Sequence, residues 1–216
     1  MRASVARILL HVAALVAAGC ATTATLRGPA GERVRVPHVQ EGALEFVAAG
    51  DAVYAAADPA GATGVAGEGK VVRPYVVRLT RDLPVYRLWA GPDVKDAQGR
   101  TSRIGQWWTF EPPSGTLASF RRRYEVCEKW DTLRFVASCT LKRGSVVVIG
   151  PGQSVSEKTC EKPGESYPPN ERDLQVYIHE AWKRTGAPGS ELNCPDEGRD
   201  YRNDPRDIAR PLLPAR

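Results

Sequence analysis

An export signal at the N-terminus constrains the fold most, because it decides how the cysteines of this chain are used. Arg2 and Arg7 precede a mostly apolar stretch, Ile8–Ala18, which is too short to span a bilayer as a mature helix and is typical of a secretion signal. Beyond position 20 the chain has four more cysteines: Cys127, Cys139, Cys160 and Cys194. An even set of cysteines in an oxidising compartment predicts two disulfide bonds.

The pairing of these cysteines is open, because four cysteines allow three connectivities. Their order along the chain favours Cys127–Cys139, which would clamp adjacent strands, and Cys160–Cys194, which would tie a late loop to the end of the domain. A metal site is the rival interpretation. The chain has no C-x-x-C motif and its three histidines are scattered, so we predict no metal site.

The end of the signal, Ala17–Cys20, resembles the lipobox of bacterial lipoproteins, in which the cysteine becomes the lipidated first residue of the mature chain. The resemblance implies a signal peptide over residues 1–19 and acyl chains, palmitate among them, on Cys20. Two or more acyl chains make membrane anchoring stable. Ala21, rather than an acidic residue, follows the cysteine, which by the same resemblance implies retention at the outer membrane. The alternative is an ordinary signal peptide cleaved nearby, with Cys20 incidental.

Composition divides the rest of the chain into three parts. Residues 20–70 are rich in Ala, Gly and Thr, which predicts a flexible spacer in which Arg33–Val36 could form a strand and Gly42–Ala57 a weak helix. Residues 195–216 alternate arginines with acids and contain several prolines, which predicts a disordered or loosely packed tail. The compact domain is therefore expected over residues 71–194.

Within residues 71–194 the apolar runs are short, β-branched and aromatic, which predicts an α+β fold, rich in strands and with few short helices. The candidate strands are Val71–Leu79, Leu83–Trp89, Gly105–Phe110, Tyr124–Cys127, Leu133–Leu141 and Ser145–Ile149. A short helix is expected over Thr116–Arg123. The turn residues 142–144 separate the last two strands and predict a hairpin.

The sequence of the segment that begins at Leu174 fits both a helix and a strand. Its apolar residues recur at helical spacing through Trp182, whereas Leu174–Ile178 by itself is also a good strand. Local rules favour the helix slightly.

The charge pattern argues against one class of partner. Arg121–Arg123 is the one basic cluster, and no basic stripe interleaved with aromatics accompanies it, so nucleic acid is not an expected partner.

The run around Arg87 is where chemistry is expected. Arg87 lies between Tyr86 and Leu88 in a strand-like segment, and a protein can bury an arginine only when its charge is paired or hydrogen-bonded. Arg87 is therefore either a residue at the rim of the domain or an anion-binding residue.

Four motifs, taken in order, resemble the successive strands of the ADP-ribosyltransferase-like fold of bacterial polymorphic toxins, with the tuberculosis necrotizing toxin-like NAD glycohydrolases as the most similar group. The motifs are V-Y-R-L-W-A-G, G-Q-W-W-T-F-E-P-P, G-S-V-V-V-I-G-P and L-Q-V-Y-I. The resemblance covers Leu83 to Ile178. It implies a split sheet and requires Leu174–Ile178 to be a strand, against the local preference.

The resemblance also implies roles for individual residues. Arg87 would hold the dinucleotide phosphate through its forked donors, and Gln175 would bind the ribose hydroxyls as an oxocarbenium-like centre develops, so both would be catalytic. The substrate-binding residues would be Trp107, Trp108 and Thr109, with an indole stacked on nicotinamide and the hydroxyl on the ribose or amide. Gln153 remains a competing glutamine. NAD would be the substrate, and no permanently bound cofactor is expected.

Two functions from different classes follow. The first is a lipid-anchored secreted toxin that cleaves NAD at the nicotinamide–ribose bond, as a glycohydrolase or an ADP-ribosyltransferase. A lipobox joined to such a domain resembles the myxobacterial lipoprotein toxins that pass between cells through outer-membrane contact, which implies a cognate immunity protein. The second is a non-catalytic outer-membrane lipoprotein that binds a protein or glycan through an exposed Trp107–Trp108 surface. Convergence of Arg87, Thr109 and Gln175 on one cleft would favour the first.

Overall fold

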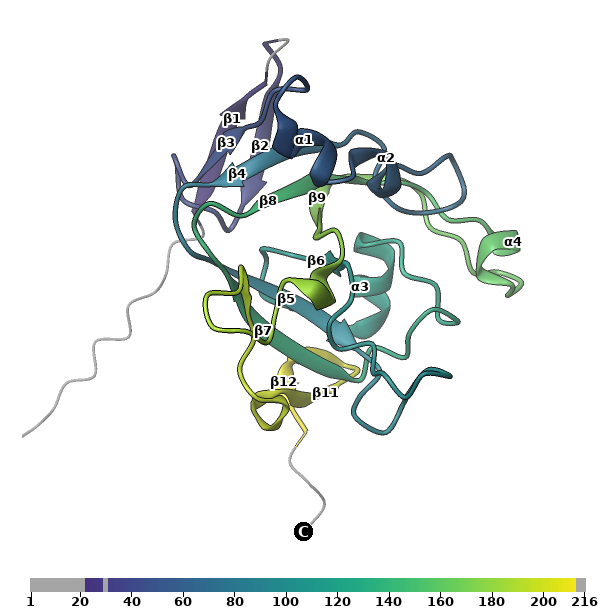
Figure 1. Ribbon diagram of the computed structural model, residues 1–216. Coiled ribbons are helices and arrows are strands. Elements are labelled where there is room, and N and C mark those ends of the chain that lie inside the picture. The colour runs from purple at the N-terminus through teal and green to yellow at the C-terminus, as the bar shows by residue number, and fades with distance from the viewer. Residues whose placement is uncertain (1–21, 29–30, 213–216) are drawn as a thin grey trace, which may run out of the picture.

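The computed structural model describes residues 22–28 and 31–212 (Figure 1). The predicted signal peptide over residues 1–19 and the predicted lipidation site Cys20 lie outside the described residues. Within the described part of the chain, no helix has the length and apolar character needed to cross a bilayer.

Two five-stranded sheets form the body, one above the other in the view of Figure 1. The first sheet has the order β3–β4–β8–β9–β6, with every pair antiparallel. Its strands are β3 (Leu44–Phe46), β4 (Tyr75–Leu79), β8 (Val146–Gly152), β9 (Asn170–Tyr177) and β6 (Trp107–Trp108).

The second sheet is built on one long strand, β7 (Phe135–Leu141), and has the order β10–β7–β11–β12, with β5 also paired to β7. The other strands are β5 (Leu83–Trp89), β10 (Leu192–Asn193), β11 (Tyr201–Asp204) and β12 (Asp207–Pro211). β5 pairs with β7 along its whole length, from Leu83 opposite Leu141 to Trp89 opposite Phe135. β5 is therefore a firmly held platform for Arg87.

The helices of the described residues are all short, which confirms the predicted α+β class. They are α1 (Ala52–Ala56), α2 (Pro59–Ala62), α3 (Leu117–Arg123) and α4 (Glu157–Cys160), with 3₁₀ turns η1 (Ala181–Lys183) and η2 (Glu197–Arg199). α3 agrees with the predicted helix. The Thr116 hydroxyl caps it by accepting from the backbone N–H of Ser119 at 3.1 Å, and Phe120 packs into a buried cluster with Leu88 and Val136.

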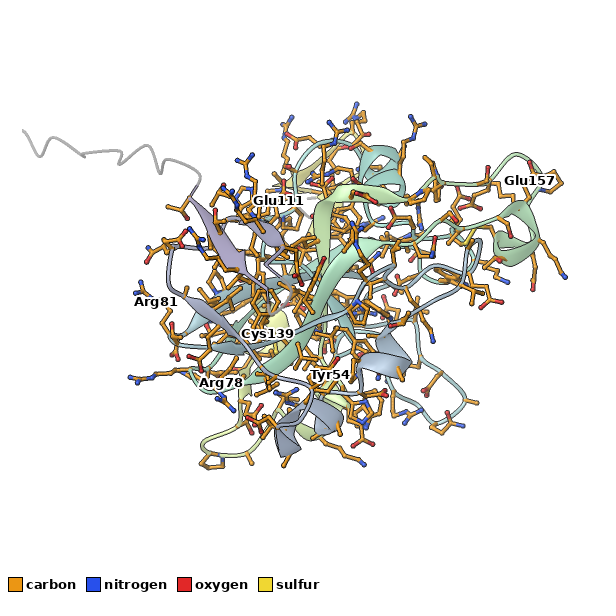
Figure 2. The ribbon with its side chains drawn as sticks, turned by 90° about the horizontal axis from the view of Figure 1, so that it is seen from above. Tyr54, Arg78, Arg81, Glu111, Cys139 and Glu157 are labelled. Carbon is orange, nitrogen blue, oxygen red and sulfur yellow. A yellow bond between two sulfur atoms is a disulfide. The ribbon has the colours of Figure 1, made fainter. Side chains whose placement is uncertain are left out.

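The core lies where the two sheets face each other. Val77 and Ile149 of the first sheet share one buried cluster with Val85 and Leu141 of the second. The alternation of apolar and polar residues along each strand directs one set of side chains into this layer. Cys139 lies among the central side chains, whereas Arg78 and Arg81 lie at the periphery (Figure 2). Glu157 lies at the far end of the excursion that carries α4 (Figure 2).

The predicted flexible spacer over residues 20–70 is wrong for its described residues, 22–28 and 31–70. β1 (Thr23–Arg27) and β2 (Arg33–Pro37) form an antiparallel pair whose alternate apolar residues are buried in the main core. Arg33–Val36 is a strand as predicted, but Gly42–Ala57 contains β3 as well as α1. A composition average hides this period-two pattern, and that pattern buries one face of the hairpin.

The predicted disordered tail over residues 195–216 is also wrong through residue 212. β11 and β12 form an antiparallel pair, and Ile208 is fully buried against Phe120 and Val136. The buried Asn203 side chain donates to the carbonyl oxygen of Leu133 at 2.9 Å. Residues 213–216 lie outside the described residues.

Three predictions of local pairing need correction. β7 and β8 do not form a hairpin, because β7 pairs with β5 and β8 pairs with β4 and β9 in the other sheet. Tyr124–Cys127 is a turn followed by irregular backbone rather than a strand. Leu174–Ile178, in contrast, is a strand through Tyr177, as the resemblance requires. Strand partners are long-range choices that local alternation does not specify.

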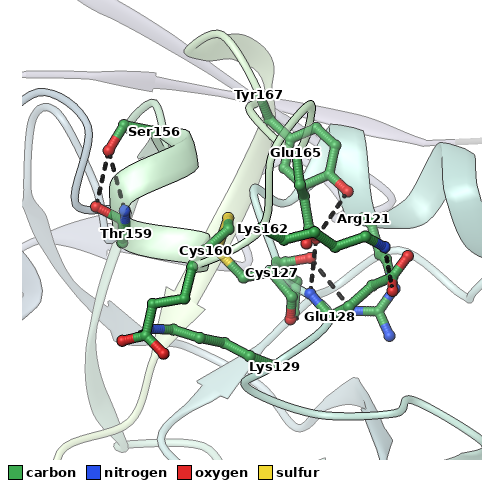
Figure 3. Close-up of a disulfide and its surroundings, with 12 residues drawn as sticks. Arg121, Cys127, Glu128, Lys129, Ser156, Thr159, Cys160, Lys162, Glu165 and Tyr167 are labelled. Atoms are coloured by element: carbon green, nitrogen blue, oxygen red, sulfur yellow. Dashed lines mark hydrogen bonds and ion pairs between the residues drawn. A yellow bond between two sulfur atoms is a disulfide. The ribbon is translucent and has the colours of Figure 1, made fainter.

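Two disulfides are present as predicted, but they are Cys127–Cys160 and Cys139–Cys194. Figure 3 shows the first of them joining α4 to the loop that follows α3. The second ties β7 to the segment after β10. The favoured pairing fails because it assumed that Cys127 and Cys139 lie on adjacent strands, whereas Cys127 lies in a loop.

Candidate active site

A cavity of about 380 Å³ is lined by β5, β6, β9, α3 and the loop after α3. All five residues that the sequence predicts for the site line it: Arg87, Trp107, Trp108, Thr109 and Gln175. The further lining residues are Glu68, Lys70, Tyr86, Leu88, Ser102, Phe120, Tyr124, Glu125, Val126, Trp130, Asp131 and Leu133. Elements far apart in the sequence therefore bring the predicted set together in one place.

Arg87 is half-buried and held by backbone carbonyls. Its Nε donates to the carbonyl oxygen of Ser102 and its Nη1 to that of Trp107, each at 2.8 Å. A Cβ on Gly105 would lie 2.5 Å from the Arg87 Cζ, so a larger residue at position 105 would displace the guanidinium from its present place. Burial lowers the pKa of Arg87 and the negative charge of Asp131 opposes that shift, but an arginine stays protonated. Arg87 is thus a preoriented cation in the cavity wall.

Thr109 lies opposite Tyr86, the residue before Arg87, on the neighbouring chain segment. Tyr86 and Thr109 exchange two backbone hydrogen bonds, of 2.8 Å and 2.9 Å, which connect β5 to the segment after β6. The Thr109 hydroxyl donates to the carbonyl oxygen of Glu111 at 2.7 Å. Because that proton is used, the hydroxyl can offer a ligand only its acceptor lone pairs.

The two tryptophans have different surroundings. Trp108 is buried, and its indole N–H donates to the carbonyl oxygen of Gly105 at 2.7 Å. Trp107 is half-buried, and its ring lies 4.9 Å from that of Tyr177. An exposed Trp107–Trp108 surface, which the binding-protein alternative expected, is therefore not what the structure has.

Gln175 is buried on β9 and both of its amide hydrogens point into the protein. Nε2 donates to the carbonyl oxygen of Tyr124 at 3.1 Å and to the Glu125 Oε2 at 2.9 Å. Gln153, the competing glutamine, does not line this cavity. Its Oε1 accepts from the backbone N–H of Ser154 at 3.0 Å, so it orders its own loop.

Glu125 is the cavity residue that sequence reasoning missed. The residue is 1% exposed, and burial raises its pKa to about 9. The hydrogen bond from Gln175 opposes the shift, and the negative charge of Asp173 adds to it. Glu125 therefore carries a proton at neutral pH. A lone acid between Tyr124 and Val126 is the signal that could have identified it.

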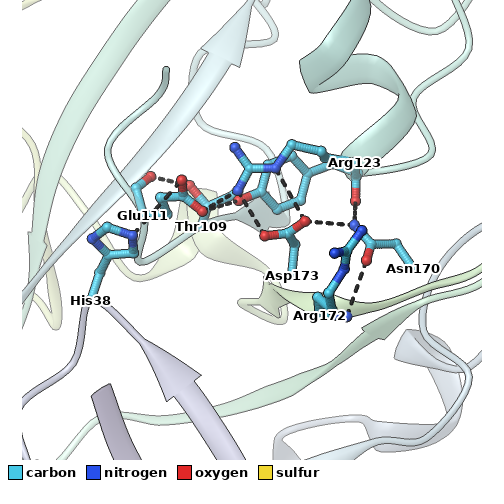
Figure 4. A network of polar contacts seen from close by, with 8 residues as sticks. His38, Thr109, Glu111, Arg123, Asn170, Arg172 and Asp173 are labelled. Carbon is cyan, nitrogen blue, oxygen red and sulfur yellow. Dashed lines mark hydrogen bonds and ion pairs between the residues drawn. The ribbon is translucent and has the colours of Figure 1, made fainter. Parts of the chain in front are cut away.

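An ionic network supports the wall next to Glu125 (Figure 4). Arg123 on α3 donates to both carboxylate oxygens of Asp173, at 2.7 Å and 3.1 Å, and also to Glu111. Burial alone would raise the pKa of Asp173, but hydrogen bonds from Arg123 and Asn170 outweigh burial and lower it. The network fixes the end of α3 against β9.

The loop after α3 is held from behind by Arg121, which is buried (Figure 3). Its guanidinium donates to the carbonyl oxygens of Val126, Cys127 and Asp131, at 3.2, 3.1 and 2.7 Å. The Cys127–Cys160 disulfide adds a covalent link. These contacts fix the part of the cavity wall that carries Glu125 and Asp131. Among the described residues, no group of three His, Cys, Asp or Glu could hold a metal ion.

The comparisons with known proteins gave few matches. No protein-family model matches the chain, and no curated protein sequence matches it. A solved structure of Tne2 in complex with Tni2 is similar, with 16% sequence identity and a TM-score of 0.36, covering 61% of this chain and 92% of that one.

Proposed function

We propose that this chain is a secreted toxin whose folded domain cleaves NAD at the nicotinamide–ribose bond. The observation that carries the proposal is the convergence of Arg87, Thr109 and Gln175, from three separate strand segments, on one cavity. Its volume of about 380 Å³ falls within the range of roughly 300–1,000 Å³ typical of small-molecule sites.

The hydrogen-bond donors and acceptors of the cavity wall match groups of NAD. Arg87 is the donor side: two of its N–H groups are used by backbone carbonyls, and the rest of the fork can bind a phosphate oxygen. Thr109 and Gln175 are the acceptor side, because their protons are already used within the protein. A ligand that fits therefore carries an anion at one end and hydroxyl or amide donors at the other, as the pyrophosphate, ribose and carboxamide of NAD do.

In the proposed reaction the bond between ribose C1′ and the nicotinamide nitrogen breaks, and its electron pair leaves with the neutral nicotinamide. The ribose becomes oxocarbenium-like, and the dipole of the Gln175 carbonyl stabilises that positive charge. Water adds to C1′ and loses one proton, so the products are nicotinamide, ADP-ribose and a proton. A glutamine supplies a dipole rather than a charge, which favours hydrolysis over activation of a protein nucleophile.

Release of nicotinamide from NAD by the purified chain tests the proposal. Arg87→Ala and Gln175→Ala should each lower kcat/KM by about 10²-fold or more, the scale on which loss of one preorganised electrostatic group acts. The matched controls are Arg122→Ala, on the exposed side of α3, and Gln153→Ala, outside the cavity. Both should keep wild-type rates. No release by the wild type, or equal losses in variants and controls, would rule the function out.

The proposal extends to location and partner. Lipidation of Cys20 would place the domain at the outer membrane, and a cognate immunity protein would bind across the cavity. Mass spectrometry of the mature chain from membranes should show an acylated N-terminal cysteine. An unmodified N-terminus elsewhere in the signal region would refute the anchor while leaving the reaction untouched.

A further inference from the structure

The buried side chain of Glu125 is unusually placed for a residue with no assigned role. Its backbone has φ of 50°, the left-handed region that non-glycine residues rarely occupy, at a cost on the order of 1 kcal/mol or more. A Cβ on Gly152 of β8 would overlap its carboxyl group, so that glycine leaves the space in which the carboxyl sits. Strain and burial of an acid at a cavity wall are typical of functional sites.

The contact between Glu125 and Gln175 decides which end of the Gln175 amide faces the cavity. Nε2 has two hydrogens, and the carbonyl oxygen of Tyr124 and the Oε2 of Glu125 accept them. The Gln175 carbonyl oxygen accepts from none of the described residues, so it is the atom left for a ligand. If Glu125 offered no acceptor, one amide hydrogen would be unpaired and the amide could turn.

The surroundings favour the neutral form of Glu125. Its Oε1 is shut off from solvent and has no hydrogen-bond partner among the described residues, which is costly for a carboxylate. Arg123 directs its charge to Asp173 and Glu111 instead. Asp173 on β9 adds negative charge nearby, and the backbone N–H of Asn170 partly offsets it. The other ionisable groups of the cavity wall are Glu68, Lys70, Tyr86, Arg87, Tyr124 and Asp131.

We propose that Glu125 is a positioning residue which, as a neutral carboxylic acid, accepts a hydrogen bond from Gln175 and holds its carbonyl oxygen toward the ligand. This inference rests on the proposed function, because Gln175 is catalytic only in that reaction. A neutral acid supplies the acceptor without a second buried negative charge beside Asp173.

Two substitutions separate the hydrogen bond from the charge. Glu125→Gln keeps a carbonyl acceptor of the same shape and cannot ionise. Glu125→Leu keeps a side chain of similar volume and removes the acceptor. In nicotinamide release, Glu125→Leu should lower kcat at least tenfold with KM changed less than threefold, and Glu125→Gln should stay within about threefold of wild type. Equal losses in both variants, or no loss in either, would overturn the inference.

Nuclear magnetic resonance provides readouts that do not depend on NAD cleavage. The side-chain amide of Gln175 should exchange its hydrogens slowly in the wild type and Glu125→Gln, and at least tenfold faster in Glu125→Leu. A ¹³C carboxyl signal that is absent from Glu125→Gln should titrate near pH 9 in the wild type. Unchanged amide exchange in Glu125→Leu, or titration near pH 4, would overturn the inference.

These readouts also distinguish the two proposals. A wild type that releases no nicotinamide but shows the protected amide and the high titration point would refute the proposed function and leave the Glu125–Gln175 contact standing. Should Glu125→Leu fail to fold, the carboxyl titration and the kinetics of Glu125→Gln still decide the inference.

Discussion

Replacing Glu125 with glutamine should change the free energy of unfolding, relative to wild type, by an amount that shifts in favour of the variant as pH rises. The folded-state pKa of Glu125 is about 9, against an ordinary value of 4.5. Between these two values the native chain keeps a proton that the unfolded chain has lost. Stability contributed by the neutral acid is therefore fully present below pH 4.5 and is lost as pH rises toward 9.

The magnitude follows from the width of that interval. Each pH unit above the unfolded pKa favours unfolding by about 1.4 kcal/mol, so the loss reaches about 3 kcal/mol at pH 7. Glu125→Gln removes this term because an amide does not ionise. Its unpaired N–H₂ group costs on the order of 1–3 kcal/mol, but that cost does not vary with pH. The prediction is therefore tested by how the difference in unfolding free energy between Glu125→Gln and wild type changes with pH, not by its value at one pH.

Urea denaturation of both proteins, with disulfides intact and at unit steps from pH 4 to pH 8, measures this slope. The difference in unfolding free energy should grow in favour of Glu125→Gln by about 1.4 kcal/mol per pH unit between about pH 5.5 and pH 8. Glu157→Gln, on the exposed surface of α4, is the matched control and should show no such slope. A flat difference between Glu125→Gln and wild type would show that Glu125 is already ionised in the native protein.

Three further predictions concern the supports of the cavity. Gly105→Ala should lower the rate of nicotinamide release at least tenfold with little effect on the unfolding midpoint. The reason is that the added Cβ would lie 2.5 Å from the Arg87 Cζ and would displace the guanidinium. A wild-type rate would show that the position of Arg87 is unimportant. Thr116→Ala should cost about 1 kcal/mol of unfolding free energy, measured in urea, through loss of the cap on α3. Replacing Cys127 and Cys160 together by serine should lower the free energy of unfolding by about 3–4 kcal/mol, given their sequence separation of 33. A loss below 1 kcal/mol would mean that the loop after α3 is held by its hydrogen bonds alone.

The residues expected at the site came from the resemblance of four ordered motifs to a known fold rather than from local patterns. Arg87 is on β5 and Gln175 on β9, and that resemblance was the reason to expect both near Thr109. The structure places all three on one cavity. The local helical spacing after Leu174 was misleading, because pairing with β8 and β6 outweighs it.

The rest of the site depends on contacts that no local pattern reports. The burial of Glu125 requires the absence of a side chain on Gly152, a residue of another strand. The Cys127–Cys160 pairing follows from the path of the loop after α3, and that path is shaped by three hydrogen bonds from Arg121. Residues 20–70 were taken for a spacer because composition averages conceal the alternation that places β1 and β2 on the core.

We propose that the cavity holds NAD and that its residues break the nicotinamide–ribose bond. Following NAD by ¹H nuclear magnetic resonance with the purified chain tests it most directly, because substrate and both products are observed together. Wild type should convert NAD to equal amounts of nicotinamide and ADP-ribose, and Gln175→Ala should leave NAD intact over the same period. NAD that persists unchanged with the wild type, or is consumed equally by Gln175→Ala, would show that this cavity does not catalyse the reaction.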